Sequence, residues 1–209
     1  MKRVLAFVVV LACAAPAAAQ EEPAFLSIRP FVMGSQQQFA AVETFEAIFG
    51  TATQPFWGGG VQVTQEDRFY VELGASKFRK TGERAFRNTG QTFRVGIPLT
   101  VTITPFEITG GYRFHLGQRV VPYIGGGPGW YRYKETSNFS TDAENVNVRK
   151  TGLVVEGGVE FRLFRWVGAA ADVHFAHIPG ILGEGGISKD AGEKDLGGVA
   201  ARVKVIVGR

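Results

Sequence analysis

The chain has 209 residues, of which 45% are hydrophobic and 20% are charged, and its formal net charge at pH 7 is +4. This length suits a single domain, and a small net charge without a dense basic patch excludes nucleic acid as an expected partner. The only cysteine, Cys13, lies in the N-terminal segment discussed next. We therefore expect neither a disulfide nor a thiol nucleophile in the rest of the chain.

Residues 1–19 have the features of a secretory signal peptide. The second and third residues are basic, Val4–Ala12 form a short apolar core, and the alanines at 17–19 form a small-residue cleavage site. The apolar run is shorter than the roughly 20 residues that a membrane-spanning helix needs. We expect residues 1–19 to be removed on export, which leaves one domain over 20–209. Lipidation at Cys13 is a weaker alternative, because the alanine site after it matches better.

The first predicted strand spans about residues 25–38. Side chains alternate between the two faces of a strand, and here one face carries Leu26 and Ile28 while the other carries Arg29. A loop over residues 39–55 follows, and within it a stripe of apolar residues near helical spacing predicts a short amphipathic turn. The residues of this stripe are Phe39, Val42, Phe45 and Phe49.

Two further strands, about 56–65 and 68–78, are joined by a tight turn at Glu66-Asp67. In the first of these strands, Trp57 shares a face with Val61 and Val63, and Gln62 and Thr64 lie on the opposite face. In the second strand, Glu72 lies opposite an apolar face that carries Phe69, Val71, Leu73 and Ala75. A polar loop is expected over residues 79–94.

The fourth strand, over residues 99–114, is less regular. Leu99, Val101 and Ile103 alternate with threonines, and after Pro105 the apolar residues fall on the other phase, from Phe106 onward. Because proline cannot donate a ladder hydrogen bond, we expect a β-bulge at Pro105.

Four more strands complete the pattern, at about 120–134, 148–164, 167–177 and 199–207. Glycines at 125–127 and 129 lie in the middle of the first, where they indicate close strand approach and strong curvature rather than a phosphate-binding loop. The connections are a short turn at 115–119, a polar loop at 135–147, a turn at 165–166 and a glycine-rich charged loop at 178–195.

The eight predicted strands are joined by connections that alternate strictly between long and short. This is the pattern of an all-β, eight-stranded antiparallel up-and-down transmembrane β-barrel, with tight turns in the periplasm and long loops outside. Each strand has the roughly 9–11 residues that a tilted spanning strand needs, and closure removes sheet edges that hydrocarbon cannot solvate. The part of the fourth strand before Pro105 is expected to project beyond the membrane.

Alternation alone does not say which face of the sheet points outward, so a soluble periplasmic, lipocalin-like binding barrel is the alternative. The charged face and the aromatic residues near strand ends favour the membrane. An interfacial aromatic girdle is expected at the outer face. Its predicted members are Trp57, Phe69, Tyr131 and Tyr133.

Pro122-Tyr123-Ile124-Gly125-Gly126-Gly127, running into Trp130-Tyr131-Arg132-Tyr133 and preceded by Tyr112-Arg113-Phe114, resembles the core of the opacity-type, OmpA-like outer-membrane β-barrel family. About 25 residues carry this resemblance. It implies an eight-stranded outer-membrane barrel, and it implies no particular activity, because that family includes adhesins, structural proteins and many unassigned members.

The polar face predicts a network of charges in the lumen. An eight-stranded barrel is only wide enough for side chains to fill it, and buried charges must pair with one another. We therefore favour a plugged lumen over a narrow, porin-like channel. The predicted network consists of Arg29, Glu72, Arg113, Glu156, Glu160, Arg162, Asp172, His174, Arg202 and Lys204.

No catalytic, metal or cofactor site is expected. Asp172 and His174 face inward and His177 faces the other way, so the two histidines cannot share a metal without a bulge. A lipid-modifying enzyme that pairs a histidine with a serine on the barrel wall is the enzymatic alternative, but Ala176 stands where that serine would be needed.

The sequence thus favours an outer-membrane protein with a structural or surface-interaction role. Its expected partners are outer-membrane lipid, the barrel-assembly machinery during biogenesis, and an extracellular partner bound through the long loops. The stripe from Phe39 to Phe49 is expected to rest on lipid headgroups, with contact to a partner as the alternative.

Overall fold

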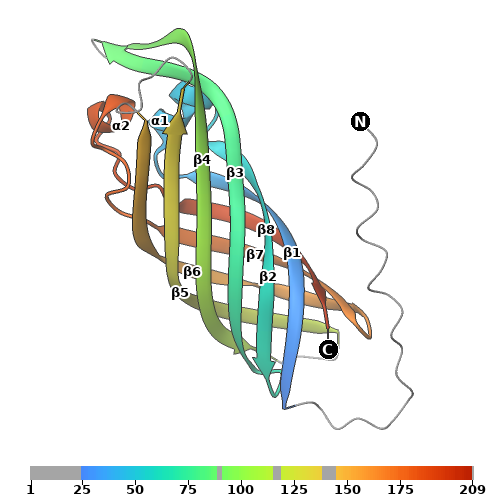
Figure 1. The fold of residues 1–209 in the computed structure, drawn as a ribbon. Coiled ribbons are helices and arrows are strands. Elements are labelled where there is room, and N and C mark those ends of the chain that lie inside the picture. Colours follow the sequence, from blue (N-terminus) through green and yellow to red (C-terminus); the bar gives the residue numbers. More distant parts are fainter. Residues whose placement is uncertain (1–24, 89–90, 115–118, 138–144, 209) are drawn as a thin grey trace, which may run out of the picture.

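The computed structural model describes residues 25–88, 91–114, 119–137 and 145–208. Within these residues eight antiparallel strands form a closed barrel, in which each strand pairs with its neighbours in the chain and the first pairs with the last (Figure 1). The predicted fold class is confirmed. The predicted signal segment, 1–19, and most of the predicted turn at 115–119 lie outside the described residues.

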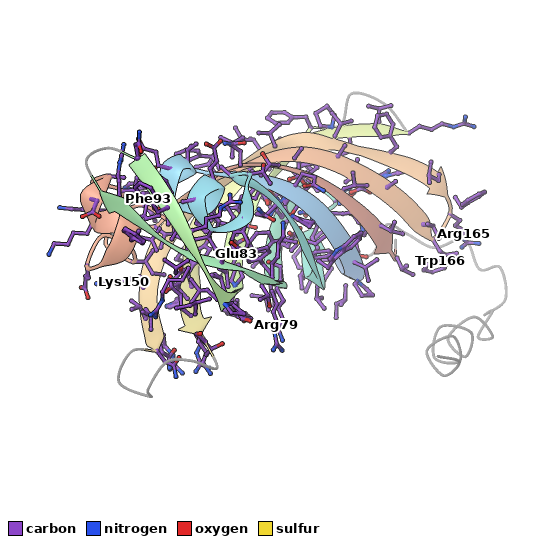
Figure 2. All side chains as sticks on the ribbon, turned by 90° about the horizontal axis from the view of Figure 1, so that it is seen from above. Arg79, Glu83, Phe93, Lys150, Arg165 and Trp166 are labelled. Atoms are coloured by element: carbon purple, nitrogen blue, oxygen red, sulfur yellow. The ribbon has the colours of Figure 1, made fainter. Side chains whose placement is uncertain are left out.

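The strands are β1 (Leu26–Phe39), β2 (Thr53–Gln65), β3 (Phe69–Asn88), β4 (Gln91–Arg113), β5 (Val120–Thr136), β6 (Val146–Phe164), β7 (Val167–His177) and β8 (Gly198–Val207). Two helices, α1 (Val42–Phe49) and α2 (Gly186–Asp190), lie together at the end of the barrel where the long connections are. The opposite end carries the tight turns, including Arg165 and Trp166, and Figure 2 shows the two ends far apart. No helix in the described part of the chain is long and apolar enough to cross a membrane.

The apolar face of the sheet points outward. On β7 and β8, Val173 and Val203 are each 59% exposed, while Asp172 and Arg202 beside them are buried. The same alternation of exposed apolar and buried polar residues runs along β2, along β6 and along the part of β3 nearer the short turns. A soluble barrel would have the opposite arrangement. The prediction of an apolar outer face and a charged interior is therefore confirmed.

β3 and β4 extend farther than the sequence predicted. Residues 79–88 and 91–94, which belong to the expected polar loop, continue the ladder as far as the pair Asn88–Gln91. The Thr81 and Thr100 hydroxyls are 2.8 Å apart across the two strands, and the rings of Phe86 and Phe93 stack with centroids 5.5 Å apart. Such cross-strand pairs stabilise the ends of β3 and β4 that extend beyond the predicted strands. The polar composition of this segment gave no sign of the pairing.

The bulge expected at Pro105 is absent, and this prediction was wrong. The β3–β4 register is the same on both sides of Pro105, and the described ladder shifts instead between Glu83 and Ala85. The apolar face nevertheless changes sides at Pro105: Leu99, Val101 and Ile103 are buried in the barrel, whereas Phe106 is 45% exposed on its wall. The strand therefore stays regular through Pro105, and it is the polarity of the barrel interior beside it that changes.

The change in surroundings is a layer of buried apolar side chains inside the long-loop end of the barrel. Phe45 of α1 stacks on Phe39 at a centroid distance of 3.7 Å, and Phe39 packs on Phe56 of β2 and Phe78 of β3. Phe39 and Phe45 are each only 1% exposed. The prediction that the 39–49 stripe rests on lipid headgroups was therefore wrong: α1 turns its apolar side into the barrel, where burial removes it from water.

Candidate functional site

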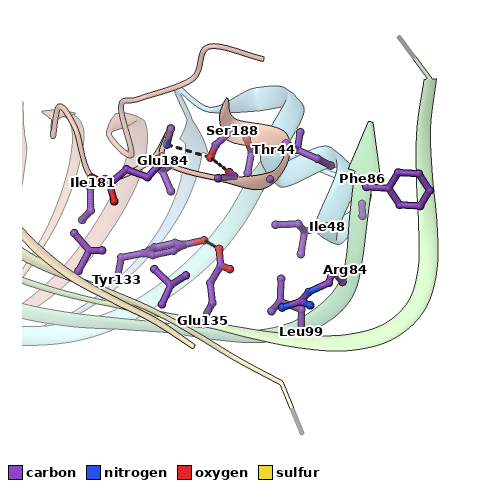
Figure 3. A pocket seen from close by; sticks show the side chains of 18 of the residues that line it. Thr44, Ile48, Arg84, Phe86, Leu99, Tyr133, Glu135, Ile181, Glu184 and Ser188 are labelled. Atoms are coloured by element: carbon purple, nitrogen blue, oxygen red, sulfur yellow. Dashed lines mark hydrogen bonds between the residues drawn. The ribbon is translucent and has the colours of Figure 1, made fainter. Parts of the chain in front are cut away.

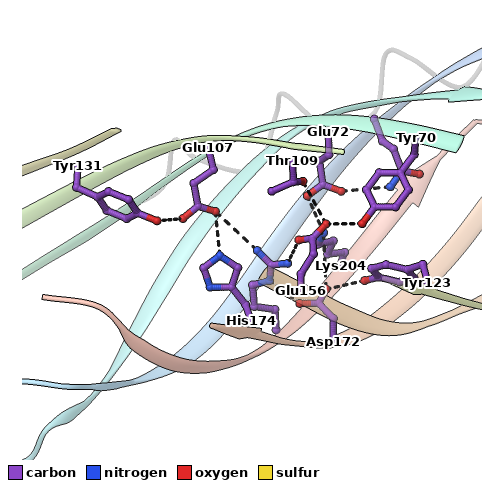
Figure 4. A network of polar contacts seen from close by, with 12 residues as sticks. Tyr70, Glu72, Glu107, Thr109, Tyr123, Tyr131, Glu156, Asp172, His174 and Lys204 are labelled. Carbon is purple, nitrogen blue, oxygen red and sulfur yellow. Dashed lines mark hydrogen bonds and ion pairs between the residues drawn. The ribbon is translucent and has the colours of Figure 1, made fainter. Parts of the chain in front are cut away.

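The middle of the lumen is occupied by a compact group of opposite charges from β3, β6, β7 and β8 (Figure 4). Lys204 Nζ lies 2.6 Å from Glu72 Oε1, 3.6 Å from Asp172 Oδ2 and 3.8 Å from Glu156 Oε2. Arg202 Nε donates to Asp172 Oδ1 at 2.5 Å, and Arg202 Nη2 donates to Glu156. Two cations thus hold three carboxylates together.

Neutral donors complete the coordination of these carboxylates. The Tyr70 hydroxyl donates to Glu156 Oε1 at 2.8 Å, and the Tyr123 hydroxyl donates to Asp172 Oδ2 at 2.7 Å. Gln62 Nε2 donates to Glu72 Oε2 at 3.2 Å. A buried charge is tolerated when its remaining lone pairs are also satisfied, and this group meets that requirement.

A second group of charges closes the short-turn end. Glu160 accepts hydrogen bonds from Arg29 Nη2 and from Arg113 Nη2, the latter at 2.9 Å. Arg113 Nη1 also lies 2.9 Å from Asp67 Oδ1, and Arg162 pairs with the other oxygen of Asp67. Asp67 sits in the β2–β3 turn with a positive φ of 56°, a conformation that aspartate tolerates and that brings its carboxylate to the barrel mouth.

A third group lies between the middle charges and the apolar layer. Glu107 Oε1 accepts a hydrogen bond from the Tyr131 hydroxyl at 2.5 Å, and Glu107 Oε2 is 3.2 Å from His174 Nε2 and 3.9 Å from Arg202 Nη1. Glu107 therefore links the ionic part of the lumen to the aromatic part above it (Figure 4).

The structure brings the predicted lumen residues together inside the barrel. All but one are buried, and Arg162, at the short-turn end, is partly exposed. The buried ones are Arg29, Glu72, Arg113, Glu156, Glu160, Asp172, His174, Arg202 and Lys204. His177 is exposed and pairs with Asp195 instead, at 2.6 Å.

The predicted aromatic girdle divides into two pairs. Trp57 and Phe69 are 72% and 57% exposed on the outer wall, where a girdle would lie. Tyr131 and Tyr133 are buried inside the barrel, and their assignment to the outer face was wrong. The sequence placed them by their aromatic character near a strand end, but their outward neighbours on β5 are Trp130, Arg132 and Lys134.

The predicted lumen network did not include Asp67, Tyr70, Glu107 and Tyr123, nor the hydrogen-bond donors Gln62 and Tyr131. Glu107 shares the inward phase of Thr109 and Arg113, so the alternation already contained the signal for it. Tyr70 is likewise flanked by the outward residues Phe69 and Val71. Asp67 belongs to a turn, where alternation carries no information.

Residues distant in the sequence fix α1 over the lumen. Its N-cap residue, Ala41, has no side-chain oxygen, and the carboxylate of Glu193 instead accepts hydrogen bonds from the backbone N–H groups of Glu43 and Thr44, both at 2.9 Å. At the other end of α1, Arg94 donates to the carbonyl oxygens of Glu46 and Ala47 at 3.0 and 2.9 Å. A negative group at the helix start and a positive one at its end both stabilise the helix.

A pocket of about 700 Å³ opens at the long-loop end, between α1, the segment around α2 and the inner faces of β3–β6 (Figure 3). Its walls are mostly apolar, with Ile48, Leu99 and Ile181 among them. Tyr133 and Glu135 form its polar side, where the tyrosine hydroxyl donates to the carboxylate. Burial raises the pKa of the Glu135 carboxyl, against the opposing effects of Tyr133 and Arg84.

Comparisons with known proteins agree with this architecture. A family model described as "Outer membrane protein beta-barrel domain" matches residues 5–194, while no curated protein matches the chain in sequence. OprG from Pseudomonas aeruginosa has a TM-score of 0.53 at 15% identity, over 88% of this chain and 95% of that one. Neisserial surface protein A has a TM-score of 0.52 at 12% identity, over 90% and 98%.

The N-terminal barrel domain of OprF from Pseudomonas aeruginosa is also similar, with a TM-score of 0.50 at 14% identity, over 88% of this chain and 97% of that one. At such low identity these structures establish the fold alone, whereas the family model covers most of the sequence. The chain belongs to the outer-membrane β-barrel protein family, as the resemblance in its β4–β5 sequence had implied.

Proposed function

We propose that this protein is a closed, non-conducting barrel of the outer membrane, with a structural or surface-interaction role and with its long-loop end as the binding region. The observation that carries the proposal is the packing of side chains inside the barrel. Ion pairs occupy the short-turn end and the middle of the lumen, and the apolar layer under α1 packs over them toward the long-loop end. Breaking one buried pair costs about 3–5 kcal/mol, so a permanent ion path would require several such losses.

The long-loop end is the side expected to face the exterior, since tight turns of such barrels lie in the periplasm. A rigid scaffold that holds shaped loops is a common arrangement for binding. The 700 Å³ pocket between α1 and α2 gives this end a concave, largely apolar surface of the kind that holds small ligands.

The protein is proposed not to be an enzyme. His174 is buried against Glu107, and no group of three His, Cys, Asp or Glu suited to a metal occurs in the described part of the chain. Incubation with lipopolysaccharide, followed by mass analysis of the lipid, tests the enzymatic alternative. Unaltered acyl chains are expected, and a consistent loss or gain of an acyl chain would support a lipid-modifying enzyme instead.

Conductance decides between the closed barrel and a narrow channel. The chain without residues 1–19 is refolded, its folding is verified by the gel mobility of unboiled and boiled samples, and it is inserted into a planar bilayer. The proposal predicts no steady current under an applied voltage. Reproducible unit steps that stay open, and that scale with the amount of folded protein, would show that the lumen conducts.

A further inference from the structure

The outer wall of the barrel carries a cluster of lysines and arginines on one side only. It consists of Lys77 and Arg79 on β3, Arg132 and Lys134 on β5, and Arg149 on β6, and all five are exposed. We call these five residues the wall patch. The outward-facing positions of β1, β2, β7 and β8, all within the described residues, carry no lysine or arginine.

The register joins these cations into neighbouring rows. Arg132 pairs across the sheet with Arg149, and both belong to the row of Thr104. In the next row toward the long loops, Thr102 lies between Arg79 and Lys134. Like charges directly opposite each other on neighbouring strands repel, so the Arg132–Arg149 pair is unfavourable unless an anion lies against it.

None of the five has an acidic partner within 4.0 Å among the described residues. Arg132 Nε donates to the neutral side chain of Asn147, at 3.0 Å. The contrast with the lumen is sharp, because Arg29, Arg113, Arg202 and Lys204 all pair with carboxylates there. The wall patch is thus a concentration of uncompensated positive charge.

The wall patch borders the apolar wall of the barrel. The row below Thr104, Arg132 and Arg149 is formed by Phe106, Trp130 and Thr151, and the rings of Phe106 and Trp130 are in contact. A pocket of about 530 Å³ is built from this junction, with walls that include Trp130, Arg132, Arg149 and Lys150. This pocket therefore places an aromatic ring next to cationic side chains at one point on the wall.

We propose that the wall patch binds the phosphate groups of a glycolipid in the outer leaflet of the membrane. Guanidinium groups bind phosphate with paired, charge-assisted hydrogen bonds. The acyl chains of such a lipid would lie along the apolar wall beneath Trp130, so its phosphates would be held at the height of Arg132 and Arg149. A lipid is favoured over a soluble anion because Trp130 lines the same pocket and contacts Phe106 on the apolar wall beside it. The proposal does not depend on whether the lumen conducts.

The test compares lipid A that carries two phosphates with lipid A from which both have been removed, each titrated into the refolded chain in detergent. The first variant is Lys77→Gln/Arg132→Gln/Arg149→Gln. The matched control, Arg119→Gln/Lys189→Gln/Lys194→Gln, removes the same charge from exposed residues elsewhere. The wild type and the control are expected to prefer the phosphorylated lipid by about tenfold or more, and the first variant to lose that preference.

An equal preference in the first variant and the wild type would overturn the proposal. Millimolar inorganic pyrophosphate is added as a further arm: unchanged lipid binding supports a lipid ligand, and complete displacement would assign the site to a soluble anion instead. Folding of each variant is checked by gel mobility before and after boiling. If the triple variant does not fold, the single variant Arg149→Gln must lower the preference, and an unchanged preference would again refute the assignment.

Discussion

Thr44 on α1 and Glu193, which lies 149 residues later in the chain, are joined by two hydrogen bonds: the Thr44 backbone N–H and hydroxyl both donate to Glu193 Oε2, at 2.9 and 2.6 Å. The contact supplies the N-terminal cap that the sequence around Ala41 lacks. It also ties α1 to the last long connection. The helix that closes the lumen therefore depends on a residue of another loop.

Replacing this carboxylate should loosen α1 without disturbing the barrel. Glu193→Ala removes the acceptor for three donors, and the loss of a helix cap costs about 1–2 kcal/mol. We expect faster amide hydrogen exchange in residues 42–49 and unchanged exchange in β7 and β8. Glu184→Gln, an exposed carboxylate in the same connection, is the control. Equal exchange in α1 for the wild type and Glu193→Ala would contradict this role.

Lys204 should be among the most sensitive positions of the lumen. Lys204→Met leaves Glu72, Glu156 and Asp172 with Arg202 as their main cation, and breaking a buried pair costs about 3–5 kcal/mol. Urea unfolding in detergent micelles measures the loss of unfolding free energy. The double variant Lys204→Met/Glu72→Gln should recover part of it, because it removes the stranded charge. No recovery would mean that Lys204 acts through its packing alone.

Gly125 makes room for Tyr70. A Cβ atom at Gly125 would lie 2.2 Å from the Tyr70 hydroxyl oxygen, which donates to Glu156. Gly125→Ala should therefore displace the ring and cost about 1–3 kcal/mol, as overpacking of a filled interior does. At Gly110 the closest atom to an added Cβ is 3.7 Å away, so Gly110→Ala is the matched control. Similar unfolding midpoints for the two alanine variants would refute the proposed clash.

The period-two alternation predicted the barrel strands, and the charges on one face of those strands predicted the charged interior and most of the lumen charges. It failed where the surroundings of the strands change. Val101 and Tyr133 keep the inward phase, but there the interior is apolar. In that part of the barrel the outside is polar instead, with Arg132 and Lys134 facing outward. Alternation separates the two faces of a strand and does not say which face is inside. Along one strand the inward face is therefore apolar in one part and charged in another.

The contacts at the long-loop end of the lumen could not be predicted from the sequence for a different reason. The contacts of Glu193 with α1 and of Arg94 with its last carbonyl groups join segments about 150 and 50 residues apart. They depend on where the loops meet above the barrel, and no local periodicity records that. The polar composition of residues 79–94 pointed to a loop, although residues 79–88 pair across the sheet with β4 as far as Gln91.

Glu135, above the apolar wall and beside the 700 Å³ pocket, should make stability depend on pH. Burial raises its pKa, so the folded protein favours the neutral acid. This contribution is fully present below the pKa of the unfolded chain and is lost as the pH rises through the higher folded value. Glu135→Gln stays neutral, so its thermal midpoint relative to the wild type should rise between pH 4 and pH 8.

The control for this pH series is Glu46→Gln, which removes an exposed carboxylate from α1. Its midpoint relative to the wild type should remain nearly constant over the same range. If Glu135→Gln followed the wild type at every pH, ionisation of Glu135 would play no part in the stability of the long-loop end.

The apolar outer wall of the barrel should contact lipid, and tryptophan fluorescence reports on that contact directly. Trp57 and Trp130 lie exposed on that wall, and Trp166 lies exposed in the tight turn between β6 and β7. The refolded chain is placed in vesicles of phosphatidylcholine, either ordinary or brominated on the acyl chains near the headgroup, and tryptophan fluorescence is compared. Strong quenching by the brominated lipid is predicted, and equal fluorescence in the two lipids would contradict the account.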